Sequence, residues 1–236
     1  MQREEDLQCQ GLKILQDDEL YTFTSDSVVL ANFVDIKRGE QAVEIGSGCG
    51  VISILLSAKT EVKKIYAFEI QKEMAQLATK NIELNNLQEK IELFYDDILN
   101  FSKHLKTGSI DVVFSNPPYM NSSYACKNTV KSIARHDDLL PPEKLCFCAG
   151  KLLKNGGRFF LCYAPSRLPE IFECMTKNKI EPKRLFFTQN QKSEIKLCFI
   201  EGVKSAKKGL KVLPNLTVND AEGKYLETLH TKYFKA

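Results

Sequence analysis

The sequence predicts an α/β protein with a mostly parallel sheet and helices on both faces. Short apolar runs alternate with amphipathic stretches between residues 41 and 201, and this alternation is typical of successive β-α-β units. Ligands of such sheets bind at the carboxyl ends of the strands. The residues that directly follow each strand are therefore the first candidates for a functional site.

Seven strands are expected, at residues 41–45, 65–69, 91–95, 110–115, 158–163, 184–188 and 196–201. Helices are expected at residues 50–59, 72–85, 143–153 and 168–178. The prolines at 117 and 118 end the fourth strand, because proline cannot donate to the ladder of a central strand. The glycines at 156 and 157 are expected to end the third helix.

The composition is that of an ordinary soluble domain: 43% of the 236 residues are hydrophobic and 27% are charged. No run of about 18 apolar residues predicts a membrane span, and residues 1–7 lack the apolar core of a secretory signal. We expect a cytoplasmic monomer with a core at residues 41–201. Residues 1–40 are expected to cover the ligand site, and residues 202–236 to form an extension packed on the core.

The eight cysteines are expected to be reduced, because several lie in apolar runs and no secretory signal precedes them. Cys146 and Cys148 are separated by one residue, whereas zinc sites use paired spacings such as C-x-x-C. No metal is therefore expected.

The charge is unevenly distributed along the chain. Residues 1–35 contain two basic and eight acidic side chains, whereas residues 176–211 contain ten basic and three acidic ones. The basic stretch is either a solvated surface or a contact for the phosphates of a nucleic acid.

The first strand ends in a glycine-rich turn, Gly46-Ser47-Gly48-Cys49-Gly50. Such a turn is either only a tight connection or a place where the backbone approaches a ligand. Val51 stands where a dinucleotide fingerprint needs its third glycine, and no P-loop lysine follows. Glu44 would repel a diphosphate but suits a ligand with a positive charge.

The next two strand ends suit a nucleoside. Glu69 can accept from two ribose hydroxyls, and Ile70 and Ile98 are placed to hold a planar ring between them. Asp96 or Asp97 can accept from an adenine amino group, although aspartates are also common in plain turns. A ribose, an adenine, a positive end and no phosphate together describe S-adenosylmethionine.

The fourth strand end is the most specific feature, Asn116-Pro117-Pro118-Tyr119. The Asn116 side chain and the Pro117 backbone each offer a carbonyl, and Tyr119 offers an aromatic face. Two convergent acceptors favour a pyramidal nitrogen, whose lone pair can then attack a methyl group. The alternative is a plain proline turn.

These residues resemble the N-P-P-Y motif of class I S-adenosylmethionine-dependent methyltransferases. The resemblance implies a Rossmann-like fold with a seven-stranded sheet. It also implies that the glycine turn, Glu69 and Asp97 bind the cofactor and that Asn116, Pro117 and Tyr119 hold the target amino group. Asp97 is preferred over Asp96 because the family has an apolar residue after the aspartate.

The flanks at residues 21–30, 134–136 and 209–214 are similar to those of bacterial tRNA adenine-N6 methyltransferases, which act on the adenine 3′ of the anticodon in a valine tRNA. This resemblance places Phe23 and Ser27 near the methionine end of the cofactor. The expected RNA contacts are Arg135, His136, Lys183, Arg184, Lys207 and Lys208.

Other N-P-P-Y enzymes methylate guanine N2 in ribosomal RNA, adenine in DNA, or a glutamine amide in release factors. About forty residues precede the core, which is fewer than the separate helical domain usual in the glutamine enzymes. No added module for reading base edges in DNA is visible. A binding protein without catalysis is a further alternative, but it has no need of two convergent acceptors.

Overall fold

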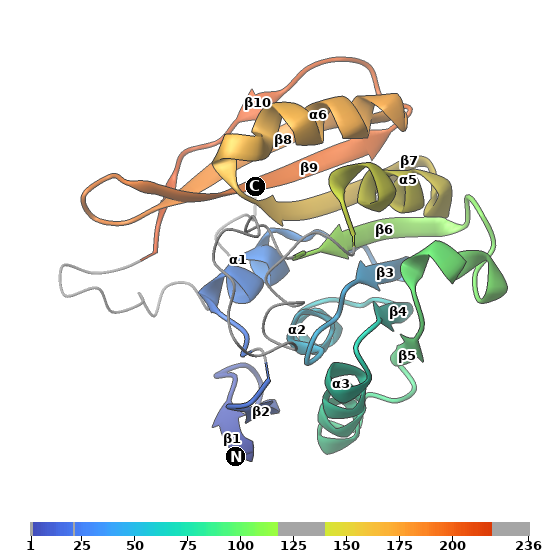
Figure 1. Ribbon diagram of the computed structural model, residues 1–236, viewed down its shortest axis with the longest axis vertical. Helices are drawn as coiled ribbons and strands as arrows, with labels where there is room; N and C mark the ends of the chain where they lie inside the picture. The colour runs from blue at the N-terminus through green and yellow to red at the C-terminus, as the bar shows by residue number, and fades with distance from the viewer. Residues whose placement is uncertain (1, 21, 118–139, 219–236) are drawn as a thin grey trace.

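The computed structural model describes residues 2–20, 22–117 and 140–218, and in this part of the chain the main sheet has nine strands. Their order is β10-β8-β9-β7-β6-β3-β4-β5, with β11 paired to β8 (Figure 1). The strands are β3 (Gln41–Ile45), β4 (Lys64–Glu69), β5 (Ile91–Tyr95), β6 (Ile110–Ser115), β7 (Leu153–Tyr163), β8 (Ile180–Gln189), β9 (Ile195–Lys204), β10 (Lys211–Val212) and β11 (Leu216–Thr217). Only β9 is antiparallel to its neighbours among these pairs.

Helices cover both faces of the sheet (Figure 1). One face carries α1 (Ser25–Phe33), α2 (Val51–Lys59) and α3 (Lys72–Leu84), and the other carries α5 (Pro142–Leu152), α6 (Leu168–Lys177) and the short 3-10 helices η1 (Ile98–Lys103) and η2 (Pro165–Arg167). Each face has its own buried cluster. Ala42 of β3 belongs to the first cluster, and Val43 and Ile45 belong to the second. Both faces of β3 are thus buried, as is usual for a central parallel strand, and Glu44 is buried with its apolar neighbours.

The predicted fold class is confirmed. The seven expected strands are the seven longest strands of the main sheet, and each expected helix forms within one residue of its predicted ends. The two-residue strands β10 and β11 extend this sheet at the β8 edge.

The expected helix stop at residues 154–157 is wrong, because β7 already begins at Leu153. Leu153 pairs with Ile110, and the register between β6 and β7 then shifts. Gly156 has a φ of 77° in this segment, a conformation that glycine adopts without steric cost. The glycine pair therefore belongs to an irregular strand rather than to a helix end.

The N-terminal residues form a hairpin of β1 (Gln2–Asp6) and β2 (Lys13–Asp17), separate from the main sheet. Asn81 of α3 and Asn85, which follows the last residue of α3, pair with the outer edge of β2. Leu15 N donates to Asn81 Oδ1 at 2.7 Å, and Asn81 Nδ2 donates to Leu15 O at 3.1 Å. Asn85 makes the equivalent pair with Lys13, at 2.9 and 2.7 Å.

The spacing explains why this docking works. Residues four apart on a helix are about 6 Å apart, and residues two apart on a strand are about 6.6 Å apart. Two asparagine amides on one helix face can therefore replace a neighbouring strand. Asn81 also donates to Cys49 O at 2.9 Å, which ties the hairpin to the glycine turn. The sequence analysis did not identify this role.

The described cysteines contain no disulfide, and burial raises the pKa of the Cys148 and Cys198 thiols to about 12. Of the helices in the described segments, none combines the length and the apolarity needed to cross a membrane.

We predict that Asn81→Ala destabilises the protein by about 3 kcal/mol, because it leaves the buried Cys49 carbonyl and the partly buried backbone groups of Leu15 without partners. Urea unfolding measures the loss. Asn85→Ala is the matched control: its hydrogen bonds to Lys13 are exposed, so water replaces them and the cost is about 1 kcal/mol or less. Equal losses in the two variants would contradict the docking role of Asn81.

Candidate active site

Four strand ends meet at one edge of the sheet. β3 lies between β6 and β4, β5 lies beyond β4, and all four are parallel (Figure 1). In register, Ile45 is opposite Phe68, and Phe68 is opposite Phe94. The glycine turn, Glu69, the Asp96-Asp97 pair and Asn116 therefore lie along the same edge, as the sequence analysis expected.

The glycine turn is held to β4 by its backbone. Gly46 N and Ser47 N both donate to Phe68 O at 3.0 Å. Gly46 has a φ of 74°, and a Cβ built on it meets no atom within 4 Å. The backbone conformation requires glycine at this position, and the space beside it is open for a ligand.

Glu69 is buried behind this turn. Its Oε2 accepts from Gly48 N at 2.7 Å, and its Oε1 accepts from Gln71 N at 2.9 Å. Burial raises the pKa of the Glu69 carboxyl, and the backbone donors of Gln71 and Gly48 oppose that rise. Glu69 therefore shapes the glycine turn directly, a role that the sequence analysis missed. Its contact with a ribose stays a prediction.

Glu44, in β3, is buried beneath the first residues of α2. Its side chain accepts a short hydrogen bond from the Ser53 hydroxyl of α2. Burial raises its pKa to about 8, although the Ser53 hydrogen bond lowers it. Through this hydrogen bond Glu44 holds the first turn of α2 against β3. The contact of Glu44 with a positively charged ligand stays a prediction.

The two neighbouring aspartates have different surroundings. Asp96 accepts from Asp97 N and Asn100 Nδ2, each at 2.8 Å, and contacts His104 Nε2 at 2.9 Å. The hydrogen bond from His104, followed by that from Asn100, lowers the pKa of Asp96 to about 2. Asp97 accepts from Leu99 N at 2.9 Å and caps η1. Because partners occupy both oxygens of Asp96, Asp97 is the better candidate for an adenine contact.

Two isoleucines flank these acidic residues. Ile70 is 43% exposed, whereas Ile98 is buried. Ile70 is thus accessible to a planar ring from outside, and the contact of Ile98 with such a ring stays a prediction.

Asn116 lies at the end of β6, beside the first turn of α1. Its Nδ2 donates to Ser27 Oγ at 3.2 Å. Its Oδ1 is buried and has no hydrogen-bond partner among the described residues. The preceding Ser115 fixes the strand end, because its hydroxyl donates to Ile45 O at 2.7 Å. Tyr119, Arg135 and His136 lie outside the described residues.

Among the described residues, five other buried side-chain oxygens have no hydrogen-bond partner: Ser25 Oγ, Ser47 Oγ, Ser57 Oγ, Gln71 Oε1 and Thr188 Oγ1. Ser47 and Gln71 belong to the turns that follow β3 and β4 at this edge. Buried polar atoms are normally paired, so a cluster without partners indicates a place for a polar ligand. Gln71 is not among the residues predicted from the sequence, although its position two residues after Glu69 was the available signal.

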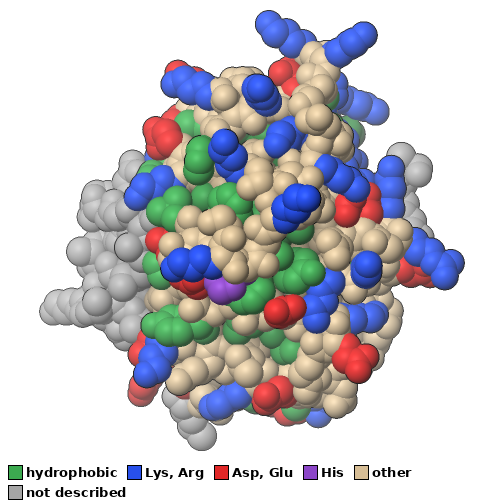
Figure 2. Space-filling model, turned by 90° about the vertical axis from the view of Figure 1, so that its right-hand side faces the viewer, with side chains coloured by type: hydrophobic (Ala, Val, Ile, Leu, Met, Phe, Trp, Pro, Cys, Tyr) green, Lys and Arg blue, Asp and Glu red, His purple; other side chains and the backbone are tan. Residues whose placement is uncertain are grey.

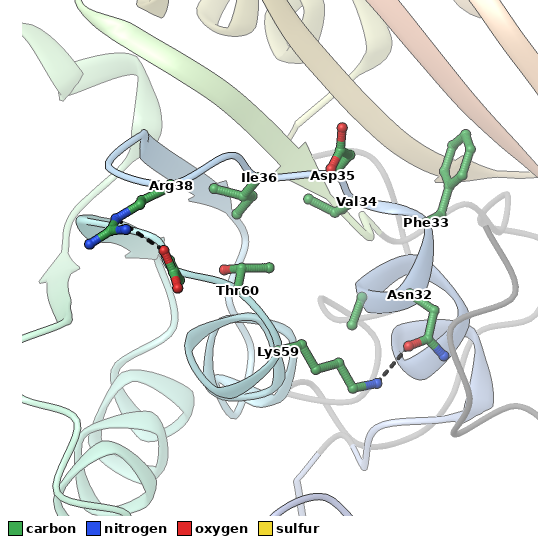
Figure 3. Close-up of a pocket in the computed structure, with 10 residues that line it drawn as sticks. Asn32, Phe33, Val34, Asp35, Ile36, Arg38, Lys59 and Thr60 are labelled. Atoms are coloured by element: carbon green, nitrogen blue, oxygen red, sulfur yellow. Dashed lines mark hydrogen bonds and ion pairs between the residues drawn. The ribbon is translucent and has the colours of Figure 1, made fainter. Parts of the chain in front are cut away.

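A separate pocket of about 270 Å³ lies away from this edge (Figure 3). The C-terminal ends of α1 and α2 line it, together with residues before β3 and β4. Lys59 Nζ contacts Asn32 Oδ1 at 2.6 Å, and Arg38 Nε contacts Glu61 at 3.2 Å. Because it lies toward the amino ends of the strands, this pocket is not the candidate site.

The basic residues 176–211 do not share one environment. Arg184 pairs with Glu201 and lies 5.0 Å from the centre of the Phe33 ring. Lys183 Nζ donates to Lys207 O at 3.2 Å, and Lys208 is exposed. Figure 2 shows Lys and Arg side chains spread over one face with Asp and Glu between them. Contact of these residues with RNA stays a prediction.

Comparison with known families identifies similar proteins. Residues 23–164 match the model of the methyltransferase small domain. The curated protein tRNA1(Val) (adenine(37)-N6)-methyltransferase of Phocaeicola vulgatus is 32% identical over 135 residues, which are 57% of this chain and 56% of that protein. The protein of the same name from Photorhabdus laumondii is 27% identical over 206 residues, covering 86% of this chain and 83% of its own length.

Solved structures share the fold at low identity. A predicted O-methyltransferase from Agrobacterium tumefaciens superposes with a TM-score of 0.69 and 17% identity, over 87% of this chain and 95% of that one. Geranyl diphosphate C-methyltransferase from Streptomyces coelicolor, solved with S-adenosyl-L-homocysteine, superposes with a TM-score of 0.56 and 9% identity. The match covers 76% of this chain and 78% of that one.

We predict that Glu44 makes the ligand-free protein less stable as pH rises from about 4.5 to 8. In this window the unfolded chain ionises Glu44, whereas the folded chain keeps it protonated, so folding costs more as pH increases. One pKa unit corresponds to about 1.4 kcal/mol, so the change amounts to a few kcal/mol. Glu44→Gln should flatten this decline in urea unfolding between pH 5 and 8, and an unchanged slope would contradict the burial argument.

Proposed function

The chain belongs to the methyltransferase small domain family, and on that premise we propose that it methylates the N6 amino group of an adenine in tRNA. Its cofactor is S-adenosylmethionine, which supplies an electrophilic methyl group on a sulfonium when bound. The proposed target is the adenine 3′ of the anticodon, position 37 in the names of the relatives from Phocaeicola vulgatus and Photorhabdus laumondii.

The observation that carries the proposal is the unpaired, buried Oδ1 of Asn116. An adenine N6 group has two hydrogens to donate, and the Pro117 carbonyl follows as a second acceptor. Two acceptors draw the amino group away from the plane of the ring and make its lone pair available. A general base is not required, because the methylated nitrogen becomes acidic and loses its proton to water.

We propose that the residues along this strand edge hold the cofactor. Glu69 accepts from the ribose, Asp97 accepts from the adenine, and Ile70 covers the ring. Gly46, Gly48 and Gly50 let the backbone approach the amino-acid end, near Phe23 and Glu44. The open space beside Gly46 and the exposed side chain of Ile70 fit such a ligand.

An anticodon loop suits a single-domain enzyme. Its bases are already unstacked, so a base enters a pocket without the cost of opening a duplex. We propose that Tyr119 stacks on this base. We also propose that the RNA contacts are Arg135, His136, Lys183, Arg184, Lys207 and Lys208. Residues 1–40 are proposed as a cover, and residues 202–236 as an extension of the core at 41–201.

The first test is methyl transfer from labelled S-adenosylmethionine to unmodified total tRNA, ribosomal RNA, duplex DNA and a release factor in parallel. Digestion to nucleosides and amino acids identifies the labelled group. We expect label in N6-methyladenosine from tRNA. Label in guanine N2 or in a glutamine amide would overturn the proposed substrate.

Asn116→Ala should lower the rate of transfer by at least about 100-fold, because it removes an acceptor that acts in the transition state. Calorimetric titration with S-adenosylmethionine should give an unchanged affinity. Turnover close to that of the wild type would refute the role of Asn116.

The double variant Lys207→Glu, Lys208→Glu reverses two charges. It should raise the KM for tRNA and leave the KM for the cofactor unchanged. The slope of the logarithm of the RNA-binding constant against the logarithm of salt concentration should decrease by the contribution of about two phosphate contacts. The same double reversal at Lys103 and Lys106, which are exposed near η1, is the control for net charge. Equal effects of both pairs would mean that residues 207 and 208 make no specific contact.

A further inference from the structure

We propose that Ser27 is a positioning residue that fixes the orientation of the Asn116 side-chain amide. This inference rests on the proposed function of Asn116. It goes beyond the expected contact of Ser27 with the cofactor, because it assigns the Ser27 hydroxyl to the amide of the catalytic asparagine. Ser27 makes the side-chain carbonyl of Asn116, rather than its NH2 group, face the target amino group.

The contact that carries the proposal joins two elements far apart in the sequence. Asn116 Nδ2 donates to Ser27 Oγ at 3.2 Å across 89 positions. With Nδ2 turned toward α1, Oδ1 points away from Ser27 and is buried without a partner. The Asn116 amide thus donates one N–H to Ser27 and leaves its carbonyl oxygen available to a ligand.

The orientation decides the chemistry. An asparagine amide has nearly the same shape after a half turn, so shape alone does not select the acceptor face. In the turned orientation, NH2 would meet the hydrogens of the target amino group, and both groups are donors. A hydroxyl that accepts from Nδ2 therefore selects the productive orientation.

Ser27 is rigidly held. It is 4% exposed, and its backbone N donates to Thr24 O at 3.1 Å in the first turn of α1. The other end of α1 is anchored by Phe33, whose ring packs edge-on against Phe160 at 5.4 Å and Phe186 at 5.0 Å. The strand side is fixed as well, because Ser115 binds Ile45 O. The two partners of the contact therefore have little freedom to separate.

The first experiment compares Ser27→Ala with the wild type at saturating cofactor and tRNA. Loss of the hydrogen bond leaves the partly buried NH2 group of Asn116 without this partner in the productive orientation. We expect kcat to fall about tenfold, with unchanged affinity for S-adenosylmethionine in calorimetry. Ser27→Thr keeps the hydroxyl and should restore most of the rate.

Ser57→Ala is the matched control. Ser57 is also a buried helical serine, its Oγ has no partner, and it lies in α2. Alanine is the best helix former, so neither alanine variant is expected to lose the fold. We expect Ser57→Ala to keep the rate of the wild type. An unchanged kcat in Ser27→Ala, or weaker cofactor binding with kcat retained, would overturn the positioning role.

A second readout does not depend on the substrate. The side-chain NH2 signals of Asn116 in a ¹⁵N NMR spectrum are assigned by their loss in Asn116→Asp. In Ser27→Ala, exchange of these hydrogens with water should become at least about tenfold faster, whereas in Ser57→Ala it should not change. Unchanged exchange in Ser27→Ala would overturn the inference even if tRNA is methylated. Faster exchange would support it even if another substrate proves correct.

Discussion

The parallel pairing of β6, β3 and β4 is the constraint on which the whole candidate site depends. It brings the ends of these strands to one edge, and a few further hydrogen bonds fix the ends themselves. Phe68 O accepts from the turn after β3, and the Ser115 hydroxyl donates to Ile45 O. Each strand end is thus held by its neighbour, so the glycine turn and Asn116 have defined positions before any ligand binds.

Burial of two carboxyl groups beside this edge is unfavourable for the folded chain alone. Burial raises the pKa of both Glu44 and Glu69, so the ligand-free protein bears a cost that a positively charged, hydrogen-bonding ligand can offset. The unpaired atoms of Ser47, Gln71 and Asn116 point to the same conclusion. The protein gives up stability at this edge to keep polar groups ready for a ligand.

The N-terminal segment connects both halves of the site. Through Asn81, the hairpin is joined to Cys49 of the glycine turn, where the cofactor is proposed to bind. Through Ser27, α1 is joined to Asn116, where the target amino group is proposed to bind. A segment that precedes the sheet in sequence thus supports both functions.

The sequence by itself determined the fold class and the chemical character of the strand ends. The apolar patterns of strands and helices can be read from residues that are neighbours in sequence. The same holds for the glycine turn and for the prolines that end the strand after Asn116. The tertiary structure decided how Glu69 holds the turn and that Ser27 meets Asn116. It also decided that Asn81 replaces a strand neighbour for β2 and that the glycines at 156 and 157 lie within β7. The reason is physical: a hydrogen bond between residues 66 or 89 positions apart depends on how the elements pack, and no local pattern of residues records that packing.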